Sequence, residues 1–451
     1  MRAVWCLTQF ITDGSDEHRT TRIVQRTSDK RTILPSEKRY TYYVHSQREN
    51  HPRVSLFQGV SMTNAKILTV ETVPSYLKER AAEIGAFDAN ANLIAKAILG
   101  GNVNYAFCVT DENTGKSIFL KQAPEFVAIF GPDGLPLSSA RMKQEIAVFD
   151  EWKSILGSDA SRFLPNIHYV DFSHMVFVMD FLDGYSLLDH VLVDQGMVSV
   201  EIARSLGEFM GRTHGSTHSS KIPLDRVDYL FKKFENRPMR DIQLEFVFTK
   251  CYKEATDEQR AGLVIDDAFM KEVEDLKSKY DGNHRHNLSL CHGDLHPGSI
   301  MIQQDSAKII DPEFCVYSNP GLDVGSLLSG YCLAAVHQAY SKNSNAVSAI
   351  INSAELIWSH YVEEMKSSGI SDELIAEIEA DAVGFTVAEV CRTALEFAGG
   401  RKWLQFDDID VKLNAKKKAL SIVGNVMTNR HSDGMKLLLS LLKELVEQNT
   451  V

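Results

Sequence analysis

Between residues 66 and 181, several runs of hydrophobic positions follow the two-residue period of β-strands. Residues 105–109 alternate large and small side chains, a polar turn follows, and 117–122 is a second apolar run, which together predict a β-hairpin. Residues 163–184 predict two further strands around a turn that contains a histidine. Residues 139–156 instead carry apolar side chains at helical spacing. We therefore expect a small sheet with one helix packed against it.

Two shorter stretches near the start of this region, 73–87 and 90–98, also have helical periodicity and are predicted to be helices that precede the first strand. Farther along the chain the pattern changes to long amphipathic helices, with one short β-like stretch among them at 299–314. The prediction is an α+β fold of two lobes. The small antiparallel N-terminal lobe is expected to span 66–181 and the helical C-terminal lobe 182–451.

Composition narrows the class of protein. The chain of 451 residues is 44% hydrophobic and 24% charged, which is typical of a globular protein with a sizeable core. Its formal charge of −12 argues against a nucleic-acid partner, because such a partner requires a basic face. No apolar run approaches the ~18 residues of a membrane span, so no membrane partner is expected. The seven cysteines occur without a CxxC pair, which is typical of free thiols in a reducing compartment.

The first 65 residues differ from the rest of the chain. Their beginning shows no signal-peptide cleavage pattern, and residues 19–53 are rich in Arg, Lys, Ser and Thr but also contain acids. We interpret residues 1–65 as a poorly ordered extension, with an organellar transit peptide as the alternative. The expectation is a soluble cytoplasmic protein, with organellar targeting left open.

The stretch "CHGDLHPGSIMI" (residues 291–302) places Asp294 just before a predicted hairpin whose second strand runs into "DPEF". Pro312 disfavours helical geometry for Asp311, so we expect an extended segment in which Asp311 and Glu313 share a face. Two neighbouring carboxylates are hard oxygen ligands that suit Mg²⁺. An aspartate that accepts a hydroxyl proton beside a metal-binding acid pair is what phosphoryl transfer requires.

Upstream residues supply the other parts that phosphoryl transfer from ATP needs. Glycines allow a backbone to approach phosphates closely. Here Gly100 and Gly101 are followed by two polar side chains, Asn102 and Asn104. Lys121 lies within a predicted strand, where a charged side chain is unexpected unless it has a function. Glu145 on the following helix is placed to pair with it. The segment Asp180, Phe181 and Leu182 lies where the lobes join, and its backbone is a candidate to bind an adenine edge.

The order of these parts resembles the protein-kinase-like fold of small-molecule kinases, the superfamily of aminoglycoside phosphotransferases and choline kinases. Four motifs, "GGNVNYAF", "FLKQA", "CHGDLHPGSIMI" and "KIIDPEFCVYSNPGLDVG", are similar to those of the S-methyl-5-thioribose kinase family. In that family a serine replaces the usual loop asparagine, as Ser299 does here. A D-x-E triplet also replaces DFG, as residues 311–313 do here. The resemblance covers the chain from Lys66 to the last helix.

The resemblance implies an ATP-dependent kinase of a sugar-like hydroxyl, with S-methyl-5-thioribose of methionine salvage as the substrate. Asp294 is implied to be the catalytic base or the group that orients the hydroxyl, and Ser299 to join the ATP-binding residues. Asp311 and Glu313 are implied to hold Mg²⁺, and Arg392 to bind the substrate. The resemblance also implies a homodimer.

Two features depart from that family. Leu135 lies where the tryptophan of a Trp-Pro segment is expected, and Arg392 stands alone where the family carries an Arg-Arg pair. A lone guanidinium lacks the recognition that a pair provides. Arg401 or Lys402 compensates if the chain folds back at residues 399–400. The substrate is therefore either methylthioribose bound through different residues, or another polyol or amino-alcohol phosphorylated by a kinase related to the aminoglycoside phosphotransferases and choline kinases.

Two other classes of function fit parts of the pattern. His292, Asp294 and His296, with "NHRHN" nearby, have the spacing of a zinc or iron site, which would indicate a metal-dependent hydrolase. That interpretation leaves Lys121 and the glycine turn unexplained. A catalytically inactive protein that only binds nucleotide is the other alternative, although every charged part of the kinase pattern is present.

Four residues near these motifs are expected to have supporting roles. Asp323 is predicted to hold the loop of Asp294 by hydrogen bonds, and His214 to be a core histidine with satisfied hydrogen bonds. Cys291 and Cys315 flank the motifs and are expected to act as small buried apolar residues.

Overall fold

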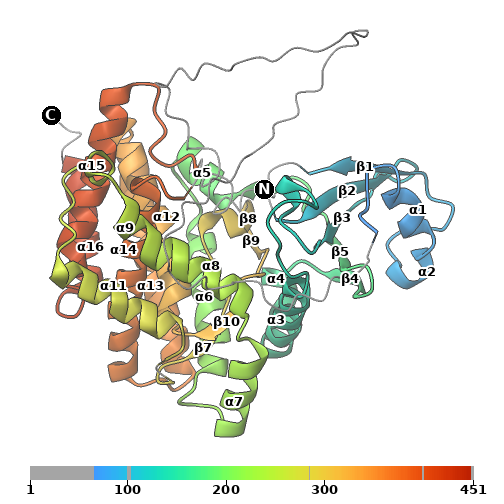
Figure 1. Cartoon of the computed structure of the whole chain (residues 1–451), viewed down its shortest axis with the longest axis horizontal. Coiled ribbons are helices and arrows are strands. Elements are labelled where there is room, and N and C mark those ends of the chain that lie inside the picture. The colour runs from blue at the N-terminus through green and yellow to red at the C-terminus, as the bar shows by residue number, and fades with distance from the viewer. Residues whose placement is uncertain (1–65, 99–102, 284, 399–400, 448–451) are drawn as a thin grey trace, which may run out of the picture.

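The computed structural model describes residues 66–98, 103–283, 285–398 and 401–447. A small lobe built around one β-sheet lies beside a larger lobe made mostly of helices (Figure 1). The predicted α+β class, with a small antiparallel sheet followed by a large helical region, is thus confirmed. No helix in the described part of the chain is long and apolar enough to cross a membrane.

Five antiparallel strands form the sheet of the N-terminal lobe, in the order β1-β2-β3-β5-β4. Their bounds are β1 Leu93–Ala97, β2 Tyr105–Asp111, β3 Ser117–Gln122, β4 Ile167–Asp171 and β5 Val176–Asp180. Both predicted hairpins are present, because β2 pairs with β3 and β4 pairs with β5. Lys121 on the central strand β3 lies opposite Ala106 of β2 and Phe177 of β5. A strand on each side therefore fixes the backbone of this lysine.

Helices cover both faces of this sheet. On one face, α1 (Val73–Lys78) and α2 (Ala81–Ile84) pack an apolar layer that includes Leu120 of β3. On the other face lies α3 (Arg141–Leu156), the helix predicted from the sequence, packed against β3 and β5. Since side chains alternate along a strand, Lys121 points to the opposite face from Leu120, toward α3.

Of the two helical predictions for the start of this lobe, one is wrong. Residues 90–98, expected to be helical, contain strand β1, which pairs with β2 along its whole length. Long-range pairing with β2 overrides the helical preference of "LIAKA". Residues 73–87 form two short helices rather than one, and Gly85 ends the second in the left-handed conformation, with φ 67°.

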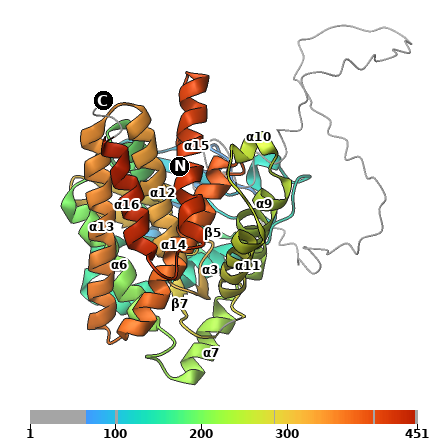
Figure 2. The same cartoon turned by 90° about the vertical axis from the view of Figure 1, so that its left-hand side faces the viewer.

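The C-terminal lobe is a bundle of helices, as predicted. The long ones are α6 (Val200–Thr217), α12 (Gly321–Tyr340), α13 (Ser344–Ser367), α14 (Asp372–Ala394), α15 (Ile409–Met427) and α16 (Gly434–Glu447) (Figure 2). Helix α12 is buried along almost its whole length and packs against α13, α14, α15 and α16. The short ones are α5 (Leu188–Asp194), α7 (Leu224–Lys233), α8 (Arg237–Glu245), α9 (Cys251–Glu254), α10 (Asp257–Arg260) and α11 (Asp267–Tyr280), while the short helix α4 (Ala160–Phe163) precedes β4 in the N-terminal lobe. Single 3-10 turns lie at Ala128–Phe130, Gly157–Asp159 and Pro297–Ser299, and a π-helical turn at Phe246–Lys250.

Short strands are embedded among these helices. The predicted hairpin is formed by β8 (Ile300–Gln303) and β9 (Ser306–Ile309), and β6 (Ser186–Leu187) pairs with β8. The sequence pattern missed a second pair, β7 (Ser289–Cys291) and β10 (Val316–Ser318). These two strands are three residues long and fully buried, so they lack the alternation that marks a half-exposed strand.

Two loops start and end on these strands. The β7–β8 loop comprises residues 292–299 and the β9–β10 loop residues 310–315. Because β7 pairs with β10 and β8 pairs with β9, strands that are hydrogen-bonded to one another hold both ends of both loops. This arrangement brings the two motifs that the sequence singled out next to each other.

Candidate active site

Lys121 forms the ion pair with Glu145 that the sequence predicted. The Nζ atom of Lys121 lies 2.9 Å from Oε1 and 2.8 Å from Oε2 of Glu145 on α3. Both side chains are buried. The pair follows from local structure, because β3 directs Lys121 toward α3 and Glu145 lies on the face of α3 that packs against the sheet.

Asp311 and Glu313 complete a group of acids around Lys121. The Nζ atom of Lys121 also donates to Asp311, and Glu313 Oε2 lies 4.0 Å from it. Carboxylate oxygens of Glu145, Asp311 and Glu313 lie within 4.8 Å of one another. The two loop acids therefore meet as predicted, but the predicted extended backbone is wrong. Asp311 has a φ of 63°, in the left-handed region, which aspartate tolerates better than most residues and which its contact with Lys121 stabilises.

Asn104 and Arg141 hold Glu313 from the other side. Asn104 Nδ2 donates to Glu313 Oε2 at 2.9 Å, and Asn104 Oδ1 accepts from Arg141 Nε at 3.1 Å. Arg141 Nε also lies 3.7 Å from the same Glu313 oxygen. Asn104, expected from the sequence to contact phosphate, thus connects the N-terminal lobe to the β9–β10 loop.

Charge in this group is not balanced, since three carboxyl groups face the two cationic side chains of Lys121 and Arg141. Burial raises the pKa of Glu145 to about 8 and also raises the pKa of Glu313 above its ordinary value. Burial alone lowers the pKa of the Lys121 ammonium, but the neighbouring carboxylates, Asp311 foremost, raise it above its ordinary value. A further cation would favour the ionised form of the acids, so the group is suited to receive one.

A cavity of about 540 Å³ lies beside these acids and between the lobes. Seven of the residues predicted for the site line it, namely Asn104, Lys121, Glu145, Asp180, Phe181, Leu182 and Asp311. The Asp180 carboxylate is engaged by Nε2 of His168 and the backbone N of Asn166, each at 2.8 Å. The carboxylate of this segment is therefore already engaged by protein groups. Gly101 and Asn102 of the predicted glycine turn lie outside the described residues.

Apolar side chains that the sequence did not single out form much of the cavity wall. They come from both lobes, as Ile98, Ala106, Phe119, Met179, Leu187, Met301 and Ile310. An apolar lining contributed by both lobes suits a flat heteroaromatic ring.

Asp294 lies in the β7–β8 loop and is only 5% exposed. Its Oδ1 atom has no hydrogen-bond partner among the described residues, and its Oδ2 atom lies 3.7 Å from Nε2 of His296. The loop itself holds the residue in place. Asp294 N donates to His292 Nδ1 at 3.2 Å, and Ser299 Oγ donates to the Asp294 carbonyl oxygen at 2.9 Å. One carboxylate oxygen is thus held in a buried position without a hydrogen-bond donor among the described residues.

Four predicted site residues, Asp294, Ser299, Glu313 and Arg392, are not among the described residues that line the cavity. Ser299 is completely buried, and its hydroxyl supports the backbone of Asp294. Its contact with ATP therefore stays a prediction from the resemblance.

Asp323 on α12 holds the β7–β8 loop, as predicted. Its Oδ2 atom accepts from the backbone N of His292 at 2.7 Å, and its Oδ1 atom accepts from the backbone N of Gly293 at 2.9 Å. His214 Nε2 lies 3.1 Å from Asp323 Oδ2, and His214 Nδ1 lies 3.4 Å from the Tyr361 hydroxyl. His214 is thus a core histidine with both ring nitrogens engaged, which confirms that prediction.

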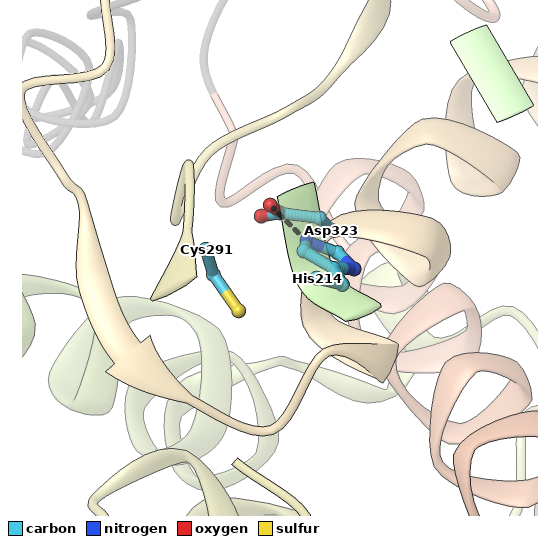
Figure 3. A group of neighbouring side chains, drawn as sticks. All are labelled: His214, Cys291 and Asp323. Atoms are coloured by element: carbon cyan, nitrogen blue, oxygen red, sulfur yellow. Dashed lines mark hydrogen bonds and ion pairs between the residues drawn. The ribbon is translucent and has the colours of Figure 1, made fainter. Parts of the chain in front are cut away.

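Cys291 stands apart from the hydrogen-bonded pair of His214 and Asp323 (Figure 3). The three residues lie close enough to suggest a metal site. The buried thiol of Cys291, however, donates to backbone carbonyls, including that of Asn319 at 3.5 Å. Burial also raises its pKa well above the ordinary value, which disfavours the thiolate that a metal requires. The three residues therefore form a structural network.

The histidine spacing that suggested a hydrolase does not form a ligand group among the described residues. His292 Nε2 bonds to the carbonyl oxygen of Ile310 at 3.0 Å, and its ring stacks on Trp152. His296 Nδ1 accepts from the backbone N of Gly298 at 2.9 Å. Both histidines therefore brace the loop, and His284 of the nearby "NHRHN" lies outside the described residues.

A second polar group lies on α14 and just beyond its end. Arg392, completely buried, places Nη2 3.2 Å from Oε2 of Glu389, one helical turn earlier. Arg401 Nη1 lies 3.8 Å from the same Glu389 oxygen and donates to Thr393 Oγ1 at 3.3 Å. The chain thus folds back so that two guanidinium groups converge on one carboxylate. Lys402 instead pairs with Asp194 on α5, at 3.2 Å.

Burial raises the pKa of Asp294 to about 7. The charges of Arg392 and Arg401 lower this pKa, whereas those of Glu389 and Asp311 raise it, so all four side chains act on Asp294. Asp294 therefore lies in the field of both polar groups. A carboxylate with a pKa near neutrality is well matched to accept a proton at physiological pH.

Two charged site residues escaped the sequence analysis. Arg141 begins α3, where an arginine ordinarily faces solvent, yet here it is buried and donates to backbone carbonyl oxygens of Pro124, Leu137, Ser138 and Val103. Glu389 lies in the otherwise apolar helical stretch "FTVAEVCRTALEF", three residues before Arg392. A charged pair at that spacing within an apolar helix is the pattern that would have indicated Glu389.

The model of the phosphotransferase enzyme family matches residues 94–346, which is more than half of the chain. Curated relatives include a methylthioribose kinase of Geobacillus sp. (strain WCH70), 27% identical over 372 residues that cover 78% of this chain and 90% of the relative. A methylthioribose kinase of Bacillus velezensis is 26% identical over 398 residues, which cover 84% of this chain and 94% of the relative.

Solved structures give a more distant likeness. A glucosamine kinase in complex with glucosamine, ADP and inorganic phosphate has a TM-score of 0.46 at 12% identity, covering 79% of this chain and 86% of that chain. A choline kinase from Cryptosporidium parvum Iowa II has a TM-score of 0.45 at 16% identity, covering 85% of this chain and 98% of that chain.

Proposed function

The chain belongs to the phosphotransferase enzyme family, and from this premise we propose that it transfers the γ-phosphoryl group of ATP to a hydroxyl group of S-methyl-5-thioribose. One observation carries the proposal. Lys121, Glu145 and Asp311 line the cavity between the lobes, and the neighbouring loop presents Asp294 with an unpartnered, buried carboxylate oxygen. The choice of substrate is supported by the curated relatives, which are named methylthioribose kinases.

Asp294 acts on the acceptor. It takes the proton of the attacking hydroxyl, whose oxygen forms a bond to the γ-phosphorus while the bond from that phosphorus to the leaving oxygen of ADP breaks. Lys121, held by Glu145, binds phosphate oxygens, and the backbone of residues 180–182 binds the adenine. Positioning and charge neutralisation supply most of the reduction of the barrier.

The acid group fits a Mg²⁺ ion. Three carboxyl groups lie within 4.8 Å of one another, and Glu313 Oε1 is buried without a hydrogen-bond partner among the described residues. Asp311 and Glu313 would hold the ion, since carboxylate oxygens are its preferred protein ligands. When bound, the ion neutralises charge on the phosphates. Asn104 and Arg141 keep the Glu313 carboxylate in position for this role.

Arg392 and Arg401 are proposed to recognise the acceptor together. Both guanidinium groups lie near the Glu389 carboxylate, so two cationic side chains are close to one carboxylate on this side of Asp294. Such a site disfavours a cationic alcohol such as choline or an aminoglycoside. It favours an uncharged polyol, whose hydroxyl groups accept from guanidinium N–H groups and donate to the Glu389 carboxylate. The sugar substrate is therefore preferred over the amino-alcohol alternative.

The test is a comparison of acceptors. ATP consumption is measured with methylthioribose, ribose, choline, homoserine and an aminoglycoside at matched concentrations. We expect methylthioribose to exceed each of the others by about 100-fold or more in kcat/KM, the size of discrimination that unpaired buried polar groups impose. An inert methylthioribose beside an active alternative would overturn the substrate but leave the kinase. Stoichiometric Zn²⁺ with turnover that needs no ATP would overturn the kinase as well.

Three further points stay predictions and belong to this proposal. They are a homodimer, a cytoplasmic location and a boundary between the lobes at residues 181 and 182. Light scattering on the purified protein tests the first, and imaging of a tagged full-length chain tests the second.

A further inference from the structure

Helix α8 and the residue before it contact both active-site loops through side-chain amides. Asn236, at the N-terminal cap of α8, is buried, and its Nδ2 atom donates to the carbonyl oxygens of Glu313 at 2.9 Å and Cys315 at 3.0 Å. Both acceptors lie in the β9–β10 loop, which carries the proposed metal ligands. Asn236 has a φ of 43°, a left-handed conformation in which asparagine is among the favoured residues. Asparagine therefore suits this position both by its left-handed backbone and by its side-chain donor.

Gln243, two turns farther along α8, makes the equivalent contact with the other loop. Its Nε2 atom donates to the carbonyl oxygen of Gly293 at 2.7 Å, and the side chain is buried. Gly293 directly precedes Asp294, so this hydrogen bond acts on the peptide unit that leads into the proposed base. Neither amide is among the described groups that line the cavity.

The two loops also touch each other at the point that α8 spans. Gly293 has a φ of 85°, and a Cβ atom there would lie 2.0 Å from the carbonyl oxygen of Phe314. The backbones of the two loops are therefore in direct contact, with no room for a side chain between them. Met239 of α8 packs on Phe314 and, with it, on Val103 of the N-terminal lobe. One short helix thus meets both loops and the opposite lobe.

We propose that Asn236 and Gln243 are positioning residues that set the distance between the proposed base, Asp294, and the proposed metal ligands, Asp311 and Glu313. A buried amide that donates to a loop carbonyl fixes the peptide plane, and two such amides on one rigid helix fix two loops relative to each other. This inference rests on the proposed function for the roles of the loops, but the contacts themselves do not depend on it.

Hydrogen–deuterium exchange tests the contacts without any substrate. Gln243→Met keeps the size of the side chain and removes the donor, and it is expected to speed exchange in residues 292–296 by about fivefold or more, as the loss of a buried hydrogen bond implies. Asn236→Gly keeps the left-handed backbone and removes the donor. It is expected to speed exchange in residues 311–317 instead. Asn287→Gly is the matched control, because Asn287 is also buried and left-handed but donates to Leu374. It should leave exchange in both loops within twofold of wild type.

Kinetics then separate positioning from simple loss of stability. Gln243→Met is expected to lower kcat about tenfold with an unchanged Mg²⁺ concentration for half-maximal rate. Asn236→Gly is expected to raise that Mg²⁺ concentration about fivefold or more, whereas Asn287→Gly lowers only the melting temperature. If the Gln243→Met variant does not fold, Gln243→Asn is used in its place, because its side chain is one methylene shorter and withdraws the amide from the loop.

The inference is overturned if both variants leave exchange in both loops at the wild-type rate, or if Asn287→Gly changes the loops as much as they do. Failure of the proposed function looks different. In that case the wild-type protein consumes no ATP with any acceptor, while the exchange pattern of the variants still reports on the two contacts.

Discussion

The two polar groups beside the cleft bury charge in opposite ways. On the side of the N-terminal lobe, Lys121 contacts three carboxyl groups, and Asn104 and Arg141 hold Glu313. In the second group, on the side of α14, one carboxylate oxygen of Asp294 is unpartnered among the described residues, the other lies 3.7 Å from Nε2 of His296, and the pKa of Asp294 is raised to about 7. Each group thus keeps one buried carboxylate oxygen without a partner, Glu313 Oε1 in the first and Asp294 Oδ1 in the second, and such an unpaired acceptor costs about 1–3 kcal/mol. The difference is that ion pairs fix the side chains of the first group, where the nucleotide is proposed to bind, whereas mainly the loop backbone fixes Asp294, the proposed base.

The largest expected effect comes from removing the charge of the second group. Asp294→Asn should lower kcat by about 10³-fold or more, because the amide cannot take the hydroxyl proton. The affinity for ATP should change by less than about threefold, since Asp294 lies outside the cavity lining. Steady-state kinetics and nucleotide titration measure both, and Asp305→Asn, an exposed aspartate on the neighbouring hairpin, is the control. Turnover retained in Asp294→Asn would remove this residue from the mechanism.

Breaking the first group should have a different signature. Lys121→Met leaves two buried carboxyl groups and the half-buried Asp311 with one fewer cation, so it should lower both stability and ATP binding. We expect KM for ATP to rise about tenfold or more and the melting temperature to fall by several degrees, as a loss of about 2 kcal/mol or more implies. Lys116→Met, in the exposed turn before β3, is the matched control. An unchanged melting temperature would show that Lys121 is not the centre of a stabilising group.

An arginine variant tests whether the second group recognises the acceptor. Arg401→Ala should raise KM for the acceptor about tenfold, the worth of one charge-assisted hydrogen bond, and leave KM for ATP unchanged. Lys402→Ala is the neighbouring control, because Lys402 pairs with Asp194 on α5 instead. If both variants shift the acceptor KM equally, Arg401 has no specific part in recognition.

The last effect is on stability and depends on pH. The pKa of Asp294 in the folded protein, about 7, lies above its ordinary value of 3.8. The folded state therefore binds more protons than the unfolded state between about pH 4 and 7, so the free energy of unfolding falls as pH rises through that window. Asp294→Asn removes this loss and should gain stability relative to wild type on going from pH 4 to pH 8, by at most about 4 kcal/mol. Denaturant unfolding at the two pH values measures the gain, and a pH-independent difference would contradict the raised pKa.

Much of the fold could be predicted because its elements have strong local patterns. The hairpins β2–β3, β4–β5 and β8–β9 and helix α3 follow from residue periodicity and turn signals. Strand β1 could not be predicted, since "LIAKA" is helix-favouring and becomes a strand only by pairing with β2. The strands β7 and β10 are too short and too uniformly buried to show a period.

The family match confirms the predicted phosphotransferase class. That prediction rested on charged residues at positions where local structure does not favour them, such as Lys121 within a strand. The sequence by itself determined those residue types and their order along the chain, because strands, turns and motif spacing are local properties. Only the tertiary structure decided how distant segments meet. It placed Asp311 in the left-handed region and Arg401 beside Glu389. It also buried Arg141 next to Glu313 and brought α8 into contact with both loops. Each of these depends on contacts between residues far apart in sequence, whose partners no local pattern can specify.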